Sequence, residues 1–370
     1  MNVPFLDLSV QYASIRGDID EAFRGIFSSC AFSGGPPVQA FEAAFAEYCD
    51  VRHCVGVGSG TAALELLLRA YNIGAGDEVI TVSHTFFATA EAVSLTGARP
   101  VFVDVRAESG LMQPSLIEKA ISEKTRAILP VHLYGQIADV DAITAIAKSH
   151  RLIVIEDCAQ AHGARYHNRR AGGLADGGAF SFYPGKNLGA FGEAGAVTTN
   201  DPDIATRVRM LRDHGSSVQY IHETVGRNER MDSLQAAALL VKLKRLDAWN
   251  ERRRSHAALY RSLLADCPGM RFIEVSPHNE AVYHLFVVRV PQRDRIREAL
   301  SSQSIGTGIH YPIPLHLQRA YEHLAYHPGD FPTSEKLASE VLSLPIFPEL
   351  IDEQIAHVAT CLTDILRFSA

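Results

Sequence analysis

The chain has 370 residues, of which 47% are hydrophobic, and a formal net charge of −7 at pH 7. A chain of this length can bury a large core and more often forms two domains than one. It contains no run of about 18 uninterrupted apolar residues, and its opening segment lacks the basic and apolar regions of a secretory signal. These features argue against a membrane partner and predict a cytoplasmic protein.

The six cysteines lie far apart in the sequence and form no CxxC pair. This spacing favours reduced thiols over a disulfide framework or a zinc site. Cys158 directly follows an acidic residue, Asp157, and we interpret it as a small buried side chain rather than a redox group. We therefore expect no structural metal.

The first informative segment is 53–64, where a strand pattern runs into a glycine turn and then an apolar-periodic helix. Free amide groups at the start of such a helix, near Gly60, can bind a phosphate together with the hydroxyls of Ser59 and Thr61. The glycines also allow a dinucleotide-binding turn. That motif, however, requires an acid closing the next strand, about 20 residues on, and the strand at 78–82 is followed by Ser-His-Thr-Phe-Phe instead.

The aromatic pair after that strand is Phe86 and Phe87. An aromatic ring at this position can stack on the flat ring of a cofactor. The alternative is ordinary core packing, and the sequence pattern leaves both interpretations open for each residue.

Residues 52–200 alternate between strand and helix patterns, as a parallel sheet with helical crossovers requires. Between the strands, residues 140–148 have the apolar spacing of a helix with one buried face. The strand candidates are apolar or β-branched and are bounded by turn residues: 78–82, 100–104, 126–132, 151–156, 178–182 and 195–199. The sequence therefore predicts an α/β fold with a mostly parallel central sheet.

Asp157 ends the apolar run 152–157, which is typical of a buried strand in a parallel sheet. Ligands of open α/β sheets bind at this end of the strands. The acid can cap the segment that follows. It can also keep the ring nitrogen of pyridoxal phosphate protonated, which lets the ring accept electrons from a carbanion. Gln160 and His162 follow closely and belong to the same candidate site.

Lys186 follows the strand predicted at 178–182 and lies among several glycines. A lysine traps a carbonyl group only where burial or a neighbouring cation lowers its pKa, so apolar and constrained surroundings favour that role. A loop lysine without partners is usually a solvated charge. The stretch between Asp157 and Lys186 holds a turn, a short excursion and one strand, so both side chains can reach one ligand.

From about residue 234 the pattern changes to one long helix that we expect to bridge to a second domain. Asp247 and Glu251 interrupt a basic cluster on this helix, and we interpret the cluster as a solvated face rather than a nucleic-acid surface. Its members are Lys242, Lys244, Arg245, Arg252, Arg253 and Arg254. His323 and His327 have a spacing that can hold zinc, but no further ligand lies in register, and a surface pair is preferred.

These segments together resemble the DegT-type sugar aminotransferases, which are pyridoxal-phosphate enzymes of fold type I. The resemblance extends over nearly the whole chain, from PFLDL at residues 4–8 through GSGTAAL, VSHTFFATAEAV, PVHLYGQ, EDCAQAHGA, SFYPGKNLGAFGEAGAV and GRNERMDSLQAA to IHYPIPLHLQ. It implies a large cofactor-binding domain over residues 1–245 and a smaller α+β domain over residues 246–370.

The resemblance also implies the role of each matching residue. Lys186 would form the Schiff base with pyridoxal phosphate and act as acid and base, and Asp157 would pair with the pyridine nitrogen. Gln160 would reach the phenolic oxygen, and Phe86 would stack on the ring. The phosphate would be bound by Gly60, Thr61 and Ser181. In the family an asparagine matching Asn228, beside Arg230, enters from the other subunit, which implies an obligate homodimer.

Two positions depart from the commoner family pattern. The Gly-Asp-Gly-Gly step after the lysine reads Gly-Glu-Ala-Gly here, with Glu193 as its acid, and the tyrosine before the asparagine is Arg227. Neither change touches the chemistry, but both leave the local substrate contacts open. Some relatives replace the lysine with histidine and perform dehydration, and Lys186 argues against that branch.

The expected amino donor is glutamate, which the resemblance alone implies. The block at 132–136 looks most like relatives that aminate carbon 3 of nucleotide-linked 3-keto-6-deoxyhexoses, with dTDP as the expected nucleotide. Alternatives are a C4-keto nucleotide sugar, a cyclitol ketone such as an inosose, or a non-catalytic regulator of the same fold. Candidate sugar or diphosphate contacts, each of which can equally be structural, are Tyr183, His310, Tyr311 and His316.

Overall fold

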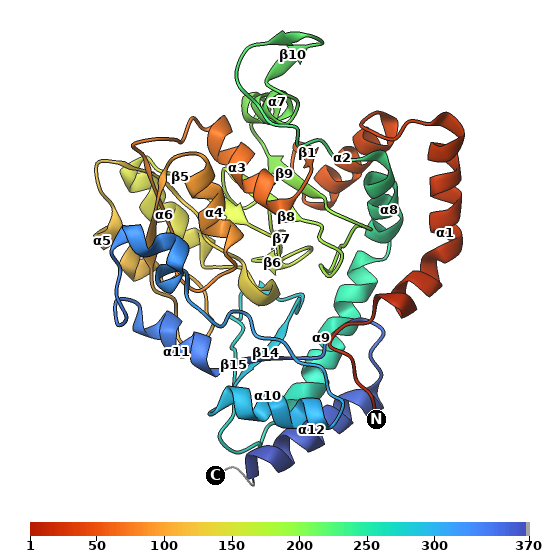
Figure 1. The fold of residues 1–370 in the computed structure, drawn as a ribbon, viewed down its shortest axis with the longest axis vertical. Coiled ribbons are helices and arrows are strands. Elements are labelled where there is room, and N and C mark those ends of the chain that lie inside the picture. The colour runs from red at the N-terminus through yellow and green to blue at the C-terminus, as the bar shows by residue number, and fades with distance from the viewer. Residues whose placement is uncertain (368–370) are drawn as a thin grey trace.

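A seven-stranded sheet forms the centre of the larger part of the molecule in the computed structural model, which describes residues 1–367 (Figure 1). Its strand order is β1-β9-β8-β5-β4-β2-β3. Strand β9 runs antiparallel to both neighbours, and the other paired strands are parallel. The α/β class with a mostly parallel sheet is thus confirmed. The strands are β1 (His53–Val57), β2 (Glu78–Val82), β3 (Arg99–Val103), β4 (Thr125–Ile128), β5 (Ile153–Asp157), β8 (Gly177–Ser181) and β9 (Gly195–Thr199).

These strands lie close to the predicted ranges, with one clear difference. Strand β4 ends at Ile128, whereas the prediction continued to residue 132. Pro130 lies in the missing part and cannot donate a backbone hydrogen bond to the ladder. Beyond it, Val131 forms only an isolated bridge with Asp157.

Helices cover both faces of the sheet, which explains why its strands are nearly continuously apolar. Ile155 packs with α3 (Gly60–Ala70), α4 (Ala88–Leu95) and α7 (Pro202–Leu211) on one face. Its neighbour Val154 packs on the opposite face, where α6 (Val140–His150) lies, because successive side chains of a strand alternate in direction. The same face carries α2 (Pro36–Tyr48) and α8 (Ser233–Leu243) farther along the sheet.

A smaller part, at the bottom of Figure 1, is built on a three-stranded sheet of order β12-β14-β15. The start of the chain also belongs to this core, because Val3 forms an isolated β-bridge with Ile305 and packs among the core residues. The strands are β12 (Arg271–Phe272), β14 (Phe286–Arg289) and β15 (Val341–Leu344), and the helices are α9 (Leu246–Leu263), α10 (Arg293–Ser302) and α12 (Asp352–Arg367). A division of the chain at residue 245 stays a prediction.

The long helix expected from residue 234 is two helices, so that prediction was wrong. Helix α8 ends at Leu243 and α9 begins at Leu246. The physical reason is that α8 packs on α2 and on α1 (Leu8–Ser29), whereas α9 packs on α12 in the other core. Helix α1 itself begins where Asp7 caps it, because the Asp7 carboxylate accepts a hydrogen bond from the backbone of Ser9.

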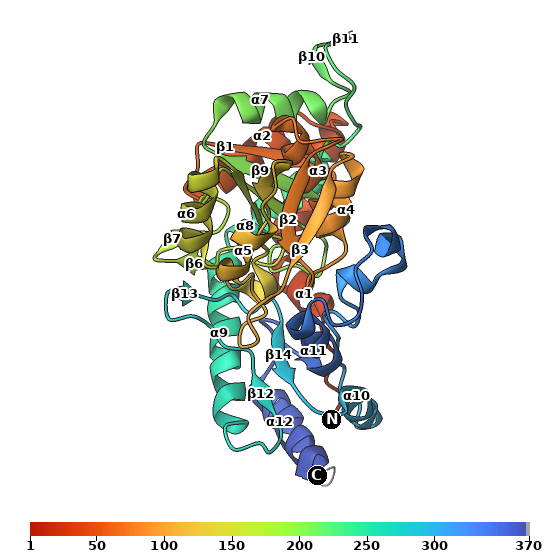
Figure 2. The same cartoon turned by 90° about the vertical axis from the view of Figure 1, so that its left-hand side faces the viewer.

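A hairpin of β10 (Ser216–Val218) and β11 (Ile221–His222) projects from the top of the larger part (Figures 1 and 2). The other peripheral elements are α5 (Ile117–Ala120), α11 (Pro332–Glu340) and a sheet of order β13-β6-β7, formed by β13 (Asn279–Glu280), β6 (Arg165–Tyr166) and β7 (Arg169–Arg170). Among residues 1–367, no helix combines the length and apolar character that a membrane crossing needs.

Candidate active site

A cavity of about 630 Å³ lies at the carboxyl ends of the central strands, and residues of both parts of the chain line it. This is the end of an open α/β sheet at which ligands bind. Most of the predicted site residues line it, namely Gly60, Thr61, Phe86, Asp157, Gln160, Ser181, Tyr183, Lys186, His310 and Tyr311.

The start of helix α3 forms one wall. Ser59 caps this helix, because its Oγ accepts a 3.1 Å hydrogen bond from the backbone amide of Ala62. The amides of Gly60 and Thr61 come before Ala62 in the chain and are not used by this cap. Gly60 lies so close to the end of β8 that an added Cβ would be 2.5 Å from the Cβ of Ser181. Only glycine permits this approach, which places hydroxyls and helix amides together as a seat for an anion.

Asp157 lies buried at the end of β5, on the floor of the cavity. Its Oδ2 accepts a 2.8 Å hydrogen bond from the Thr89 hydroxyl, and its Oδ1 accepts one from the backbone of Ala159. Burial raises the pKa of this carboxyl, while the two hydrogen bonds and the charge of Lys186 oppose the shift. The segment after Asp157 forms turns rather than a helix, so the interpretation as a helix cap was wrong.

Lys186 lies on the turn that follows β8, and its side chain reaches the same cavity. Its backbone amide donates to the carbonyl of Tyr183 at 2.8 Å, which closes the turn. Burial lowers the pKa of the amine to about 8, and the charge of Asp157 opposes that shift. An amine with this pKa can give up and regain a proton near neutral pH.

The aromatic pair is divided between the cavity and the core. Phe86 lines the cavity, is 55% exposed, and its ring centroid lies 5.5 Å from that of Tyr311. Phe87 turns away and packs against Tyr321 at 5.4 Å. Phe86 is therefore the one whose ring a flat cofactor could contact.

Gln160 has a fixed orientation in the cavity. Its Oε1 accepts a 2.6 Å hydrogen bond from the backbone of Tyr134, and its Nε2 donates to the Tyr311 hydroxyl at 3.1 Å. His162, by contrast, does not line the cavity. Its Nε2 bonds the Ser181 carbonyl at 2.8 Å, and burial lowers its pKa to about 3, so it supports β8 as a neutral ring.

Besides His162, two more predicted residues lie outside the cavity of their own chain. Asn228 is exposed and forms an isolated bridge with Asp213 near the projecting hairpin. His316 is buried between Ser83, at 2.6 Å, and Glu335, at 3.1 Å. Because both of its ring nitrogens are engaged, His316 has none left for a ligand.

Arg253 and His284 line the cavity although the sequence prediction placed neither there. Arg253 is only 3% exposed. Lys242 is buried too, and its amine donates to the Gly189 carbonyl at 2.7 Å. The solvated-face interpretation was therefore wrong for both residues. The available signal was helical spacing, since Leu246, Trp249, Arg253 and Tyr260 all lie on the buried stripe of α9.

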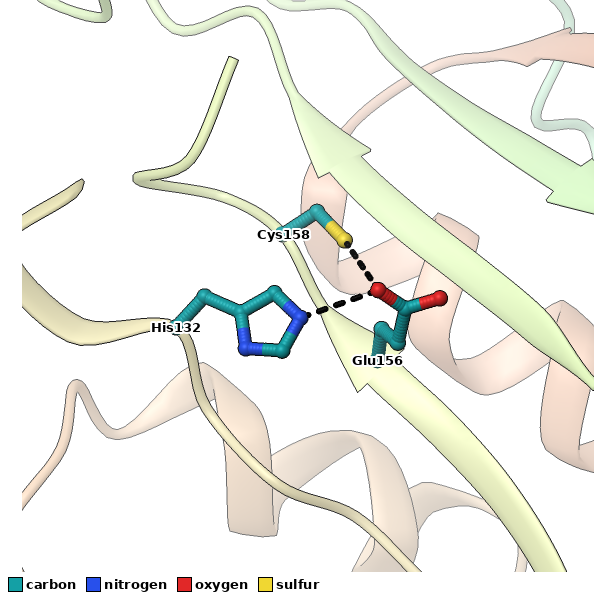
Figure 3. Close-up of side chains that lie close together, drawn as sticks. All are labelled: His132, Glu156 and Cys158. Carbon is teal, nitrogen blue, oxygen red and sulfur yellow. Dashed lines mark hydrogen bonds and ion pairs between the residues drawn. The ribbon is translucent and has the colours of Figure 1, made fainter. Parts of the chain in front are cut away.

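His132, Glu156 and Cys158 form a buried group of a kind that could hold a metal ion (Figure 3), and Asp157 stands between the last two in the sequence. His132 bonds one Glu156 oxygen at 3.0 Å. The same carboxylate accepts three backbone hydrogen bonds, from Gly172, Leu174 and Ala175. A carboxylate so fully used anchors the loop before β8, and this accounts for its burial. The spaced pair His323 and His327 is exposed, and His327 lies beyond the short helix that carries its neighbour.

The cavity fits pyridoxal phosphate by the chemistry of its side chains. The start of α3 suits the phosphate, Asp157 suits a protonated ring nitrogen, the amide of Gln160 suits a ring oxygen, and Lys186 suits the aldehyde. Together with the sheet, this arrangement defines a pyridoxal-phosphate-dependent aminotransferase of fold type I.

Comparison with known proteins makes the assignment more specific. Residues 13–363 match the DegT/DnrJ/EryC1/StrS aminotransferase family, and the chain belongs to it. The crystal structure of Streptomyces venezuelae DesV in complex with a ketimine intermediate superposes with a TM-score of 0.97 at 48% identity, covering 99% of this chain and 98% of that one.

Two curated relatives are similar along nearly their whole length. The erythromycin biosynthesis sensory transduction protein EryC1 of Saccharopolyspora erythraea is 52% identical over 98% of this chain and 99% of its own. The dTDP-3-amino-3,4,6-trideoxy-alpha-D-glucose transaminase of Streptomyces venezuelae is 50% identical over 96% of this chain and 94% of its own.

The enzyme's own residues then divide the work of amino transfer. Bound pyridoxal phosphate supplies an electron sink for a carbanion. Asp157 would hold a proton at the ring nitrogen of the bound cofactor, and Gln160 would donate a hydrogen bond from its fixed amide. Lys186 Nζ would remove and return the proton at the carbon that bears the amine, which its pKa of about 8 allows at neutral pH.

Proposed function

We propose that this enzyme transfers an amino group from glutamate to carbon 3 of a nucleotide-linked 3-keto-6-deoxyhexose, with dTDP as the nucleotide. The observation that carries the proposal is the convergence of Lys186, Asp157 and the start of α3 on one cavity. Because the donor and the acceptor use the same site in turn, the kinetics are ping-pong.

The choice of acceptor rests on a relative. The Streptomyces venezuelae relative is by name a transaminase of a dTDP-3-amino sugar, and it is 50% identical to this chain. The cavity volume of about 630 Å³ lies within the range of small-molecule sites, so the cavity has room for a ligand, but the volume does not select among the candidate acceptors. Tyr183, His310 and Tyr311 are the proposed sugar or diphosphate contacts, since all three line the cavity and Tyr183 is 56% exposed.

The proposed active form is a homodimer in the cytoplasm. The projecting hairpin and the loop after it expose four apolar side chains, Val218, Tyr220, Ile221 and Val225, and such a group on a projection suits docking onto a second copy of the chain. In the dimer, Asn228 would complete the cofactor site of the second copy. All six cysteines are unpaired, which suits the reducing cytoplasm.

The first test is the absorption spectrum of the protein loaded with pyridoxal phosphate, before and after glutamate. We expect a visible band that requires Lys186 and that glutamate removes as the pyridoxamine form accumulates. The Lys186→Ala variant should lack the band and lose turnover by at least about 10²- to 10⁴-fold. Absence of the band in the wild type would overturn the cofactor-dependent function.

A second test identifies the acceptor with dTDP-3-keto, UDP-3-keto and C4-keto sugars and scyllo-inosose. We expect the dTDP-3-keto sugar to have the highest kcat/KM. Turnover of only a C4-keto sugar, or of only the inosose, would replace the proposed acceptor by one of those two alternatives.

A regulatory role is the second candidate, because the relative from Saccharopolyspora erythraea is named a sensory transduction protein. The two functions separate at Lys186. A purely regulatory protein would keep its effect on its target after Lys186→Ala, whereas an enzyme acting through its product would lose that effect together with turnover.

A further inference from the structure

Arg253 presents an incompletely bonded guanidinium to the cavity. It lies on α9, lines the cavity, and is 97% buried, as its 3% exposed fraction shows. Its Nη1 donates to the carbonyls of Tyr283, His284 and Ile346 at 3.1, 3.4 and 2.9 Å. Within residues 1–367 its Nε is buried without a partner, and every hydrogen bond of the guanidinium is made through Nη1. Nη2 has no hydrogen-bond partner among the described residues either, so Nε and Nη2 are the two nitrogens left for a ligand.

The positive charge of Arg253 is also uncompensated by a direct ion pair. The acidic residue whose charge acts on Arg253 is Glu349, and burial raises the pKa of the Glu349 carboxyl. Arg253 and Glu349 form no salt bridge in the described chain. Burial lowers the pKa of Arg253 to about 10, so it remains charged at neutral pH. A buried cation of this kind needs an anionic partner.

A hydrogen-bonded chain connects Arg253 to the catalytic lysine. Asn187, next to Lys186, donates through Nδ2 to Asn250 and to the Val282 carbonyl. Its Oδ1 must therefore accept from Nδ1 of His284, at 3.1 Å. The His284 carbonyl in turn accepts from Arg253. This chain ties the guanidinium to the backbone segment that carries Lys186.

We propose that Arg253 binds the carboxylate of the amino donor through Nη2. This inference rests on the proposed function, since it places an amino-acid donor in the same cavity. A carboxylate held there would orient the donor so that its amine faces Lys186. The charge-assisted hydrogen bond suits a guanidinium better than any neutral donor.

The burial of Arg253 favours a small carboxylate over the diphosphate of the acceptor. A diphosphate carries a nucleoside and a sugar, and it needs several donors with open surroundings. Arg253 offers only the two unpartnered nitrogens of one guanidinium, Nε and Nη2, in a nearly closed position. The cofactor phosphate already has its seat at the start of α3, on another wall of the cavity.

The test measures binding of glutarate, a dicarboxylate without an amine, to the cofactor-loaded protein by calorimetry. We expect Arg253→Met to weaken glutarate binding by about 10- to 100-fold, the effect of losing one charged hydrogen bond, and Arg253→Lys to recover part of it. In single-turnover experiments the glutamate half-reaction should show the same loss. The half-reaction of the pyridoxamine-loaded protein with the keto sugar should keep its wild-type affinity.

The matched control is Arg254→Lys, on the same helix, which pairs with Glu251 and Glu280 at the surface and should leave glutarate binding unchanged. Since Arg253 also holds three carbonyls, its variants are compared only if they bind pyridoxal phosphate as the wild type does. If the Arg253 variants do not fold, the wild-type protein still provides a test. Glutaramide, in which both carboxylates of glutarate are amidated, should not bind to it. Unchanged glutarate affinity in Arg253→Met, or lost dTDP binding instead, overturns the proposal. Failure of wild type to react with glutamate refutes the donor itself.

Discussion

The backbone N–H of Tyr134 donates a 2.6 Å hydrogen bond to Oε1 of Gln160. Tyr134 makes this contact from a left-handed conformation, with φ of 63°, which is uncommon for a residue with a side chain. Its hydroxyl donates to the His310 carbonyl at 2.6 Å and accepts from Nε2 of His84 at 2.8 Å. Tyr134 thus orients the amide of Gln160 and also holds the backbone of His310, which lines the cavity.

We expect Tyr134→Phe to destabilise the protein by about 1–3 kcal/mol, because it leaves a buried histidine nitrogen and a carbonyl unsatisfied. Chemical denaturation measures the loss. The backbone contact to Gln160 survives the change, so affinity for pyridoxal phosphate should fall less than stability does. Tyr12→Phe, at a partly exposed position of α1, is the control. Equal stability of the two variants would contradict the prediction.

Gly60→Ala should weaken cofactor binding, because the new Cβ would meet the Cβ of Ser181 at 2.5 Å and push α3 away from β8. Overpacking of this kind typically costs about 1–3 kcal/mol. If the whole cost falls on the bound state, it corresponds to a loss of roughly 5- to 140-fold in affinity for pyridoxal phosphate, measured by fluorescence titration. In Gly25→Ala the Cβ enters open space on α1, and the affinity should not change. If Gly60→Ala binds pyridoxal phosphate as tightly as the wild type, the start of α3 is not the site that binds the phosphate.

The rate at which the cofactor-free protein captures pyridoxal phosphate should report the pKa of Lys186. Only the neutral amine attacks a carbonyl, so the rate should rise about tenfold per pH unit below pH 8 and level off above it. An ordinary lysine would keep rising to about pH 10.4.

The same measurement on Asp157→Asn tests the electrostatic coupling. The charge of Asp157 raises the pKa of Lys186 against the effect of burial, so its removal should shift the levelling point to lower pH. No shift would mean that the two groups do not interact, and a shift to higher pH would contradict the sign of the interaction.

The exposed side chains of the hairpin should stabilise the proposed homodimer. Tyr220→Asp and Val225→Asp place charges where the exposed fractions are 85% and 91%, and we expect them to raise the dimer dissociation constant at least tenfold in analytical ultracentrifugation. Leu263→Asp, at the far end of α9 and also exposed, is the control. If the hairpin variants stay as dimeric as the control, the second copy docks elsewhere.

The sequence by itself determined the class of fold and the central pair of the site. Apolar runs broken by turns define the strands. Asp157 is the last residue of β5 and Lys186 lies on the turn after β8, so chain connectivity alone carries both to the same end of the sheet. The glycine turn before α3 is equally local, because an anion seat needs only a helix start and the residues around it.

Only the tertiary structure decided which of several similar neighbours reaches the cavity. Phe86 faces it and Phe87 does not, although both are phenylalanines in succession. Arg253 is buried among basic neighbours that remain mostly in solvent, and His316 is closed off by Ser83 and Glu335. These outcomes depend on contacts between segments far apart in the chain. The packing of α9 on α12 and of the segment from residue 310 on the loop after β2 creates those contacts. Helical spacing marks the buried stripe of α9, but no local pattern shows what that stripe or the segment from residue 310 meets.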